Sequence, residues 1–315
     1  MSEVEFFRHM RVRKETFDLL IQLVKPSLDG HHRGRRPVGA TEALQMGLWY
    51  LGTQATLREI SQVFGVAEAT VYRCVSKIVN SIVALGDRYI KWPTGHMIAP
   101  TEARFKAIVD FPGILGAIDR CHIPIKPPVK TQADYINRCG KHTVNLMAVC
   151  NADKVFTFIH VGCTGSAHDS RVFRYTDIST RPELFFPSGD FHIIGDSAFT
   201  LSTHTMIPYR DSGNITPDKV NYNSKLSKSR IVIEHSFGLL KGRFRRLKFI
   251  DTQIEHVADI ISACCILHNI TIQSPQEEAM LVSEGCTVSS EDHDEVEVEL
   301  PPVPCANVTA DQKKR

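Results

Sequence analysis

Four short apolar runs between residues 114 and 194 constrain the fold of this chain more than any other feature. They cover residues 114–125, 144–150, 155–161 and 192–194, and Gly, Pro, Asn or Asp residues bound them, as is typical of β-strands. Helical patterns surround this region, and the clearest ones follow it at residues 226–247 and 256–272. Three strands followed by a helix and a fourth strand predict an α/β fold.

Three acidic residues lie within or directly after these apolar elements. Asp119 is inside the first run, Asp196 follows the last one, and Glu234 lies in the helix at residues 226–247. A carboxylate inside an apolar run is costly unless it is paired or coordinated. Carboxylate oxygens suit Mg²⁺ or Mn²⁺, which keep positions open for a phosphate and a water. If the three acids converge, the sequence predicts the metal-dependent phosphoryl transfer of a nuclease or transposase.

The helix that carries Glu234 has two distinct faces. Every third or fourth residue on one face is apolar, as in a helix that packs on a core; this stripe consists of Ile233, Phe237, Leu240, Phe244 and Leu247. Glu234, Gly238, Lys241 and Arg245 follow the same spacing on the adjoining face, where the two cations could neutralise DNA phosphates. Arg230, four residues before Glu234, could orient it. The alternative is an amphipathic surface helix with a basic face.

A fourth acid and several cations are weaker candidates. Asp169 lies in CTGSAHDSRVF, between a glycine-containing turn and a predicted helix. It could cap that helix or line the same metal site, and the sequence leaves both interpretations open. Cations after the first strand could contact phosphates or the transition state; they are Lys126, Arg138, Lys141 and His142.

The first 95 residues predict a helical region with a helix-turn-helix. Thr41 is a candidate N-cap of a helix that ends near residue 52, and a second and a third helix follow, separated by a turn at Gly65 and Val66. The third helix would enter the major groove. Its candidate DNA contacts are Glu68, Ala69, Thr70, Tyr72 and Arg73, and its predicted buried stripe is Val71, Val75, Ile78 and Ile82. The alternative is a helical bundle that packs against the next domain.

Charge is distributed unevenly along the chain. Residues 274–315 hold 10 acidic and 3 basic residues, which leaves 25 acidic and 34 basic residues before them. A basic body with an acidic tail favours a polyanionic partner such as DNA. The segment RGRRP at residues 33–37 is typical of a minor-groove arm or a nuclear localisation patch. We therefore expect three regions: a helical DNA-binding region at 1–95, a nuclease domain at 96–273, and an acidic disordered tail at 274–315.

Other features argue against secretion, membrane insertion and zinc. No apolar run approaches the ~18 residues that span a bilayer, and the charged first residues are unlike a secretory signal. Nine cysteines without a CxxC pair indicate reduced thiols in the cytosol or nucleus. Cys264, Cys265 and His268 fit a packed helix better than a zinc site.

Six motifs in the same order and spacing resemble the PIF/Harbinger transposases and the nucleases derived from them, over roughly residues 40–272. The motifs are GAIDRCHIPIKPP, YINRCGKHTVNLMAVC, GSAHDS, IGDSAF, RIVIEHSFGLLKGRF and CILHN. The resemblance implies an RNase H-like fold with a DDE triad of Asp119, Asp196 and Glu234, with Asp169 as a further metal ligand. It also implies an N-terminal helix-turn-helix and a Myb-like partner that assists DNA binding and nuclear entry.

The chain departs from the family pattern at two places. Ala198 and Phe199 follow Asp196 where the family often reads GDSGY, and Arg120 follows Asp119 where a small residue is common. Neither departure removes a carboxylate, but both could alter the fit of the substrate.

The leading functional hypothesis is a DNA endonuclease of transposase descent that uses Mg²⁺ or Mn²⁺ in two-metal phosphoryl transfer. One alternative is a domesticated, catalytically silent scaffold that binds DNA or chromatin, and another is activity on RNA or RNA–DNA hybrids. We expect the chain in the nucleus, with the cytoplasm as a second compartment, and we also consider a homo-oligomer.

Overall fold

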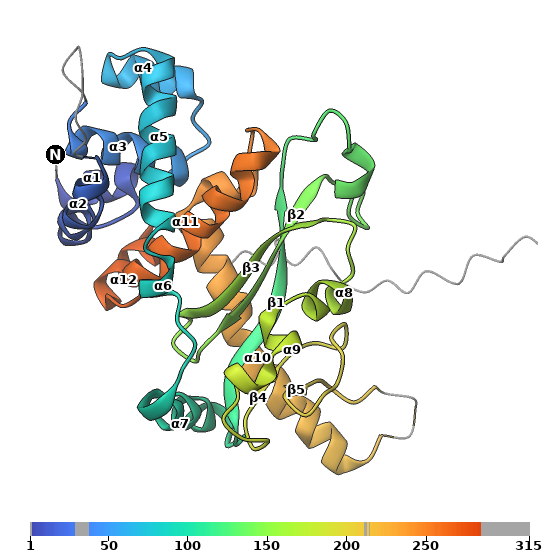
Figure 1. Cartoon of the computed structure of the whole chain (residues 1–315). Coiled ribbons are helices and arrows are strands. Elements are labelled where there is room, and N and C mark those ends of the chain that lie inside the picture. Colours follow the sequence, from blue (N-terminus) through green and yellow to red (C-terminus); the bar gives the residue numbers. More distant parts are fainter. Residues whose placement is uncertain (1, 29–37, 211–212, 214, 285–315) are drawn as a thin grey trace, which may run out of the picture.

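The computed structural model describes residues 2–28, 38–210, 213 and 215–284, apart from the side chain of Asp169. A mixed sheet of five strands lies at its centre, in the order β3-β2-β1-β4-β5 (Figure 1). β1, β2 and β3 pair antiparallel, whereas β4 and β5 run parallel to β1. The strands are β1 (Ile114–Pro124), β2 (Thr143–Cys150), β3 (Phe156–Thr164), β4 (His192–Ile194) and β5 (Thr205–Met206). The α/β class and the four predicted strands are confirmed; β5 is an additional strand.

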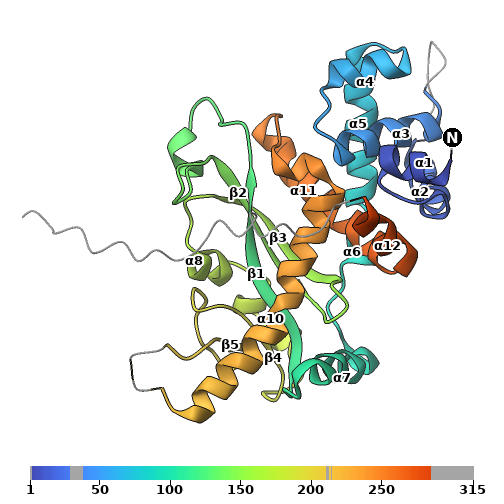
Figure 2. The ribbon, with the colours of Figure 1, turned by 180° about the vertical axis from the view of Figure 1, so that it is seen from behind.

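Helices cover both faces of the sheet, because β1 points its side chains alternately into two apolar layers. Ala117 and Cys121 pack in the larger core, under α10 and α11, whereas Leu115 and Ile118 pack in a smaller core with α8 and α9. The views from the front and from behind show the two layers (Figure 1, Figure 2). The helices are α8 (Asp169–Arg174), α9 (Asp177–Thr180), α10 (Pro217–Arg243) and α11 (Ile254–Ile272).

The N-terminal region is helical, as predicted. Its elements are α1 (Glu3–Met10), α2 (Lys14–Leu28), α3 (Ala40–Gly52), α4 (Leu57–Phe64), α5 (Glu68–Val83) and α6 (Gly86–Tyr89). The 3₁₀ turn Gly95–Met97 and α7 (Ile98–Val109) then lead into β1. A capping box of Thr56 and Glu59 starts α4, and Gly65 ends it with φ of +66°, a left-handed conformation that suits glycine.

Two details of this region test the sequence predictions. The buried stripe of α5 is confirmed, since Val71, Ile78 and Ile82 are fully buried and Val75 is 6% exposed. The prediction of Thr41 as the cap of α3 is wrong: Gly39 is the N-cap, because Ala40, a strong helix former, already takes the first helical position.

The N-terminal helices share one apolar core with the sheet and its larger helical layer. Asn269, on α11, connects them by hydrogen bonds: its Nδ2 donates to the carbonyls of Tyr89 and Phe156, and its Oδ1 accepts the Phe156 amide at 2.8 Å. Buried Arg246 likewise donates to the carbonyls of Tyr50 and Ala55. The helical region is therefore fixed to the rest of the protein by satisfied buried polar groups.

The acidic tail begins later than predicted. Residues Pro275–Ser283 form α12, so the expectation of disorder from residue 274 is wrong for this segment. Glu277 and Arg243, both fully buried, form an ion pair at 2.7 Å, and Leu281 packs with Phe7 and Leu239. These contacts offset the polar composition that suggested disorder. RGRRP and residues 285–315 lie outside the described residues.

The CILHN motif at the end of α11 has a packing role. Cys264, Cys265 and His268 are buried, and Nε2 of His268 donates to the carbonyl of Lys154 at 2.9 Å. Burial lowers the pKa of His268 to about 4, which keeps the ring neutral. In the part of the chain that the structure describes, no single helix is long and apolar enough to cross a membrane; only α11 and α12 taken together pass that test, across a bend of 111°.

Candidate active site

Asp119 lies on the face of β1 that α10 covers. Its Oδ1 accepts a hydrogen bond from the Arg120 amide at 2.7 Å, and its Oδ2 accepts one from Nη2 of Arg230 at 3.2 Å. The side chain of Asp119 is 21% exposed and that of Arg230 is 16% exposed, so this ion pair is largely shielded from solvent. The carboxylate therefore has a nearby counter-charge from the long helix.

Asp196 lies next to Asp119 because two parallel strands share a register. Ala117 of β1 pairs with Ile194, the last residue of β4, so Asp119 on β1 and Asp196 just after β4 each follow the paired position by two residues. Gly195 allows the tight turn after β4, since a Cβ there would lie 2.9 Å from the Phe199 ring. Oδ1 of Asp196 then accepts the Ala198 amide at 3.0 Å. Asp196 thus sits at the carboxyl end of its strand, where α/β sheets bind ligands.

Glu234 comes from α10, one helical turn after Arg230. Because residues four positions apart lie on the same face of a helix, the contact of Arg230 with Asp119 also points Glu234 toward β1. Ile233, next to it, is fully buried. Spacing predicted that Arg230 would orient Glu234; the structure instead pairs Arg230 with an acid on another element.

The electrostatics of Asp119 show the influence of the other two acids. The pKa of Asp119 is raised to about 7, mainly because burial disfavours the charged form; Arg230 opposes this shift, and the negative charges of Asp196 and Glu234 add to it. The Asp119 carboxylate therefore has one arginine and two further negative charges around it. Such an excess of negative charge is what a divalent cation would neutralise.

The oxygen donors fit a hard cation, although they are not arranged as a finished metal cage. Among the described side chains, no three His, Cys, Asp or Glu residues form a group that could hold a metal ion as they stand. Arg230 supplies the counter-charge to Asp119 in this arrangement. Because Mg²⁺ and Mn²⁺ prefer carboxylate oxygens, Asp119, Asp196 and Glu234 stay the predicted ligands.

Asp169 is the first residue of α8, and His168 rather than Asp169 is the N-cap. Its side chain lies outside the described residues, so its role as a metal ligand stays a prediction. The segment before it is tied down at three points. Nη1 of Arg120 donates to the Ala167 carbonyl at 2.9 Å, Nη2 of Arg138 donates to Nδ1 of His168 at 2.8 Å, and the Ser166 hydroxyl donates to the Asp134 carbonyl at 2.7 Å.

Arg120 is a contact that the motifs alone did not reveal. On a strand it points to the opposite face from Asp119, and this alternation was the available signal.

The predicted phosphate contacts after β1 have partners within the protein. Lys126 forms an ion pair with Asp251 at 2.9 Å. The amide of Lys141 donates to Oδ1 of Asn137 within a turn, and the His142 carbonyl accepts the Ile125 amide.

The predicted basic face of the Glu234 helix is only partly present. The helix was expected over residues 226–247, but α10 begins at Pro217 and ends at Arg243. Arg245 therefore lies in the 3₁₀ turn Arg245–Lys248 and off the face of Glu234 and Lys241. Phe244 leaves the helical conformation (φ −101°, ψ 81°), and the turn buries Arg246 and Leu247. The predicted apolar stripe is confirmed, since all five of its residues are buried.

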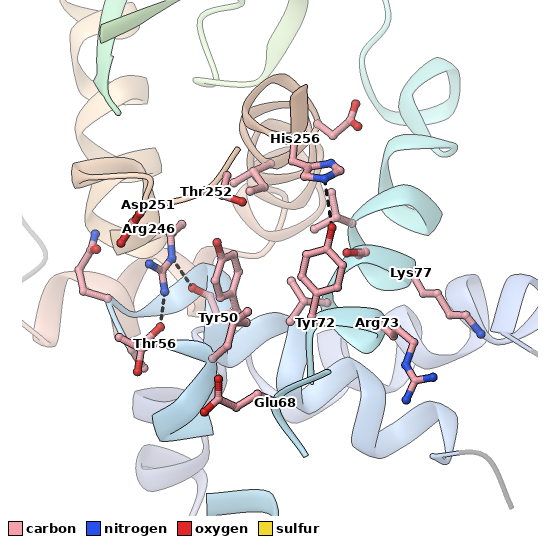
Figure 3. A pocket seen from close by; sticks show the side chains of 18 of the residues that line it. Tyr50, Thr56, Glu68, Tyr72, Arg73, Lys77, Arg246, Asp251, Thr252 and His256 are labelled. Atoms are coloured by element: carbon pink, nitrogen blue, oxygen red, sulfur yellow. Dashed lines mark hydrogen bonds between the residues drawn. The ribbon is translucent and has the colours of Figure 1, made fainter. Parts of the chain in front are cut away.

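The predicted DNA-contacting residues of α5 make local and long-range contacts. Arg73 donates to the Ala69 carbonyl at 3.1 Å and to the Thr70 hydroxyl at 3.3 Å. The Tyr72 hydroxyl forms a hydrogen bond of 3.1 Å with Nε2 of His256, at the start of α11 (Figure 3). Tyr72 and Arg73 both line a cavity of about 670 Å³ between α5 and the segment 246–260.

Comparison with known proteins shows that the segment with these acids is similar to a family of endonucleases. Residues 118–269, which include Asp119, Asp196 and Glu234, match the model of the DDE superfamily endonucleases. Over this segment, the chain is similar to the DDE superfamily endonucleases. The matched segment begins within β1 and ends within α11, so it contains the other four strands and the helix that supplies Glu234.

Curated relatives agree with this assignment. The chain is 27% identical over 259 residues to "Putative nuclease HARBI1" of Homo sapiens, which covers 81% of this chain and 73% of the relative. It is 25% identical over 289 residues to "Protein ALP1-like" of Arabidopsis thaliana, covering 83% of this chain and 69% of the relative. It is also 25% identical over 251 residues to "Probable transposase for insertion sequence element IS702" of Microchaete diplosiphon, covering 76% of this chain and 87% of the relative. No solved structure is significantly similar to the chain.

Proposed function

We propose that the chain is a DNA endonuclease of transposase descent that depends on Mg²⁺ or Mn²⁺. The observation that supports this most directly is that Asp196 and Glu234 lie close enough to Asp119 to add to the rise in its pKa to about 7, a rise that burial mainly causes. The sheet order, with three antiparallel strands followed by two parallel ones, supports the RNase H-like fold that the family resemblance implies.

Each acid would act as a metal ligand, with Asp169 as a fourth. Two bound ions would activate a water or a 3′-hydroxyl and stabilise the leaving oxygen. Arg230 keeps the Asp119 carboxylate oriented toward α10 and offsets part of the local negative charge. Cleavage needs no covalent intermediate with the protein, since carboxylates that act as ligands do not attack phosphorus.

DNA binding by the N-terminal helices is part of the same proposal. α4, the turn at Gly65 and α5 have the order of a helix-turn-helix. Thr70, Tyr72 and Arg73 lie in the first two turns of α5, and Lys241 and Arg245 would contact phosphates nearer the acids. The resemblance implies a Myb-like partner that assists DNA binding and nuclear entry. A homo-oligomer, and a nuclear location with some protein in the cytoplasm, complete the proposal.

The test is a nicking assay on supercoiled DNA with Mg²⁺ or Mn²⁺. We expect the wild type to nick the plasmid, and Asp196→Asn and Glu234→Gln to abolish nicking while the protein stays folded. Glu183→Gln is the matched control, because Glu183 is an exposed acid outside the site. Absence of nicking by the wild type with either ion, together with retained DNA binding, would favour the silent scaffold instead. Equal nicking by wild type and Asp196→Asn would also reject the proposal.

Removal of residues 1–95 is a poor test of DNA binding. Arg246, Asn269 and Arg243 donate hydrogen bonds to backbone carbonyls within those residues, at Tyr50, Tyr89 and Arg11. The truncation would leave these buried groups unpaired and destabilise the remaining protein. Substitution of Thr70 and Arg73, followed by DNA binding across salt concentrations, tests the helix directly.

A further inference from the structure

The cavity between the N-terminal helices and α11 has the size and composition of a ligand site. Its volume is about 670 Å³, within the range of roughly 300–1,000 Å³ that small-molecule sites occupy. α5, the start of α4, the segment 246–252 and the first turns of α11 line it. We call this cavity the α5–α11 cleft. It is separate from the acid cluster, and none of the three acids lines it.

Two tyrosines provide aromatic walls for the α5–α11 cleft (Figure 3). The Tyr72 ring is 43% exposed, and its hydroxyl is held by His256 at 3.1 Å. Tyr50 is buried, and the guanidinium of Arg246 lies 4.0 Å from the centre of its ring. Phe249, which is 44% exposed, lines the cleft as well. Fixed aromatic rings with an exposed face are good stacking partners for a planar ring.

Cations line the cleft as well. Arg58, Arg73 and Lys77 line the cleft and are exposed, and Arg73 is oriented by hydrogen bonds to the Ala69 carbonyl and the Thr70 hydroxyl. Aromatic platforms beside exposed cations are typical of sites for unpaired nucleotides, in which a base stacks and its phosphate meets the cations.

Three acidic residues also line the cleft: Glu68, Asp251 and Asp259. Asp251 forms an ion pair with Lys126, which neutralises its charge. Glu68 lies in the first turn of α5, and Asp259 lies on α11. Carboxylates accept hydrogen bonds from the exocyclic amino groups of bases. The cleft therefore offers aromatic rings and hydrogen-bond acceptors for a base, and cations for the phosphate of the same nucleotide.

We propose that the α5–α11 cleft binds a nucleotide, with its base stacked against Tyr72 and its phosphate at Arg73 and Lys77. The nucleotide would come from an unpaired position of a DNA strand or would be a free nucleotide. The inference deepens the proposed function, because a strand held here lies on the same protein as the acid cluster.

The test measures binding without metal, in EDTA, so that it does not depend on cleavage. Fluorescence anisotropy would follow a labelled adenosine monophosphate and, separately, a short labelled single-stranded oligonucleotide. We expect Tyr72→Ala to weaken binding by roughly 5- to 150-fold, the value of one base–aromatic stack. Tyr72→Phe keeps the ring and retains most of the affinity. Lys106→Ala, which removes an exposed cation on α7, is the control for charge alone.

The outcomes distinguish the two sources of the nucleotide from each other and from the absence of nucleotide binding. Tyr72-dependent binding of the oligonucleotide alone supports a DNA strand as the source, and the same dependence for the mononucleotide supports a free nucleotide. Equal affinities of Tyr72→Ala and Lys106→Ala for both probes would overturn the proposal. A protein segment would then be the alternative occupant of the cleft.

Photocrosslinking gives a second measurement on the unmodified wild-type chain. A strand that carries 5-iodouracil should crosslink to Tyr72 or His256 on irradiation. Crosslinks confined to other segments would refute nucleotide binding in the α5–α11 cleft. Nicking without cleft binding would reject only this inference, whereas cleft binding without nicking would reject only the proposed endonuclease.

Discussion

Arg230, on α10, donates a hydrogen bond of 3.2 Å to Oδ2 of Asp119 in the middle of β1. The two residues are 111 positions apart in the chain, and their contact brings the helix of Glu234 over the strand of the first acid. It also provides the positive charge that limits the rise in the pKa of Asp119.

Arg230→Gln should therefore raise the pKa of Asp119 further, because burial and the other two carboxylates would act without opposition. We expect the pH at which nicking is half-maximal to move upward by about one unit or more, which corresponds to about 1.4 kcal/mol. Arg230→Lys, which keeps a charge, should shift it less. A pH profile of Arg230→Gln that coincides with that of the wild type would show that the pair does not tune the site.

The pKa of Asp119 predicts opposite effects of pH on metal-free stability and on metal binding. In the metal-free protein, folded Asp119 keeps its proton up to about pH 7, whereas the unfolded carboxyl loses it near 3.8. The folded state binds more protons in this window, so the free energy of unfolding falls as pH rises from 3.8 to 7. The loss is at most about 4 kcal/mol, from 1.36 kcal/mol per pKa unit. Asp119→Asn should lack this slope in urea titrations.

Metal binding should have the opposite dependence on pH: it should strengthen as pH rises, because a divalent ion needs the deprotonated carboxylate. Stabilisation by Mn²⁺, measured as a shift in the urea midpoint, should grow between pH 6 and 8, and nicking should rise with it. A shift that is constant over this range would contradict the assignment of Asp119 as a ligand.

Periodicity predicted most of the elements but few of the contacts that build the site. The first three strands, α11 and the stripe of Ile233 could be read from the sequence, since each has a regular apolar pattern. The first turns of α10 could not, because PDKVNYNSK lacks such a stripe; Tyr222 holds them by donating to the Ile207 carbonyl and by packing on Phe111. Partners such as Arg230 for Asp119 depend on the sheet order, which no local pattern encodes.

The buried pair of Arg243 and Glu277 should be a major source of stability for the C-terminal helix. Their side chains are 1% and 0% exposed, and Arg243 also donates to the Arg11 carbonyl. Glu277→Gln would leave a buried guanidinium without its counter-charge, which should cost about 3–5 kcal/mol. Urea unfolding would measure the loss. Asp177→Asn, which breaks the exposed pair with Arg181, should cost no more than about 1 kcal/mol.

The double variant Arg243→Met with Glu277→Leu separates the pair from its individual charges. Because apolar residues of similar volume can replace a buried ion pair, the double variant should regain much of the stability that Glu277→Gln loses. A double variant that is as unstable as Glu277→Gln would indicate that the backbone hydrogen bonds of the pair, to the Arg11 carbonyl and from the Arg13 amide, matter more than the charge pair.

Arg120 should act as a positioning residue for the segment that leads to Asp169. It follows Asp119 on β1, and its Nη1 holds the Ala167 carbonyl two residues before Asp169. Arg120→Ala should release this segment and reduce nicking by about 100-fold, the typical effect of a displacement of about 1 Å at a catalytic site. Arg171→Ala, which removes an exposed arginine from α8, is the control.

A double-mutant cycle distinguishes positioning from a loss of stability. If Arg120 acts through Asp169, the activity of Arg120→Ala combined with Asp169→Asn should equal that of Asp169→Asn alone. Once the Asp169 carboxylate is removed, the loss of Arg120 can no longer displace it. The Mn²⁺ concentration for half-maximal nicking should also rise in Arg120→Ala at an unchanged urea midpoint. Additive losses in the cycle, together with a lower midpoint, would assign Arg120 to the fold and leave Asp169 without this link to β1.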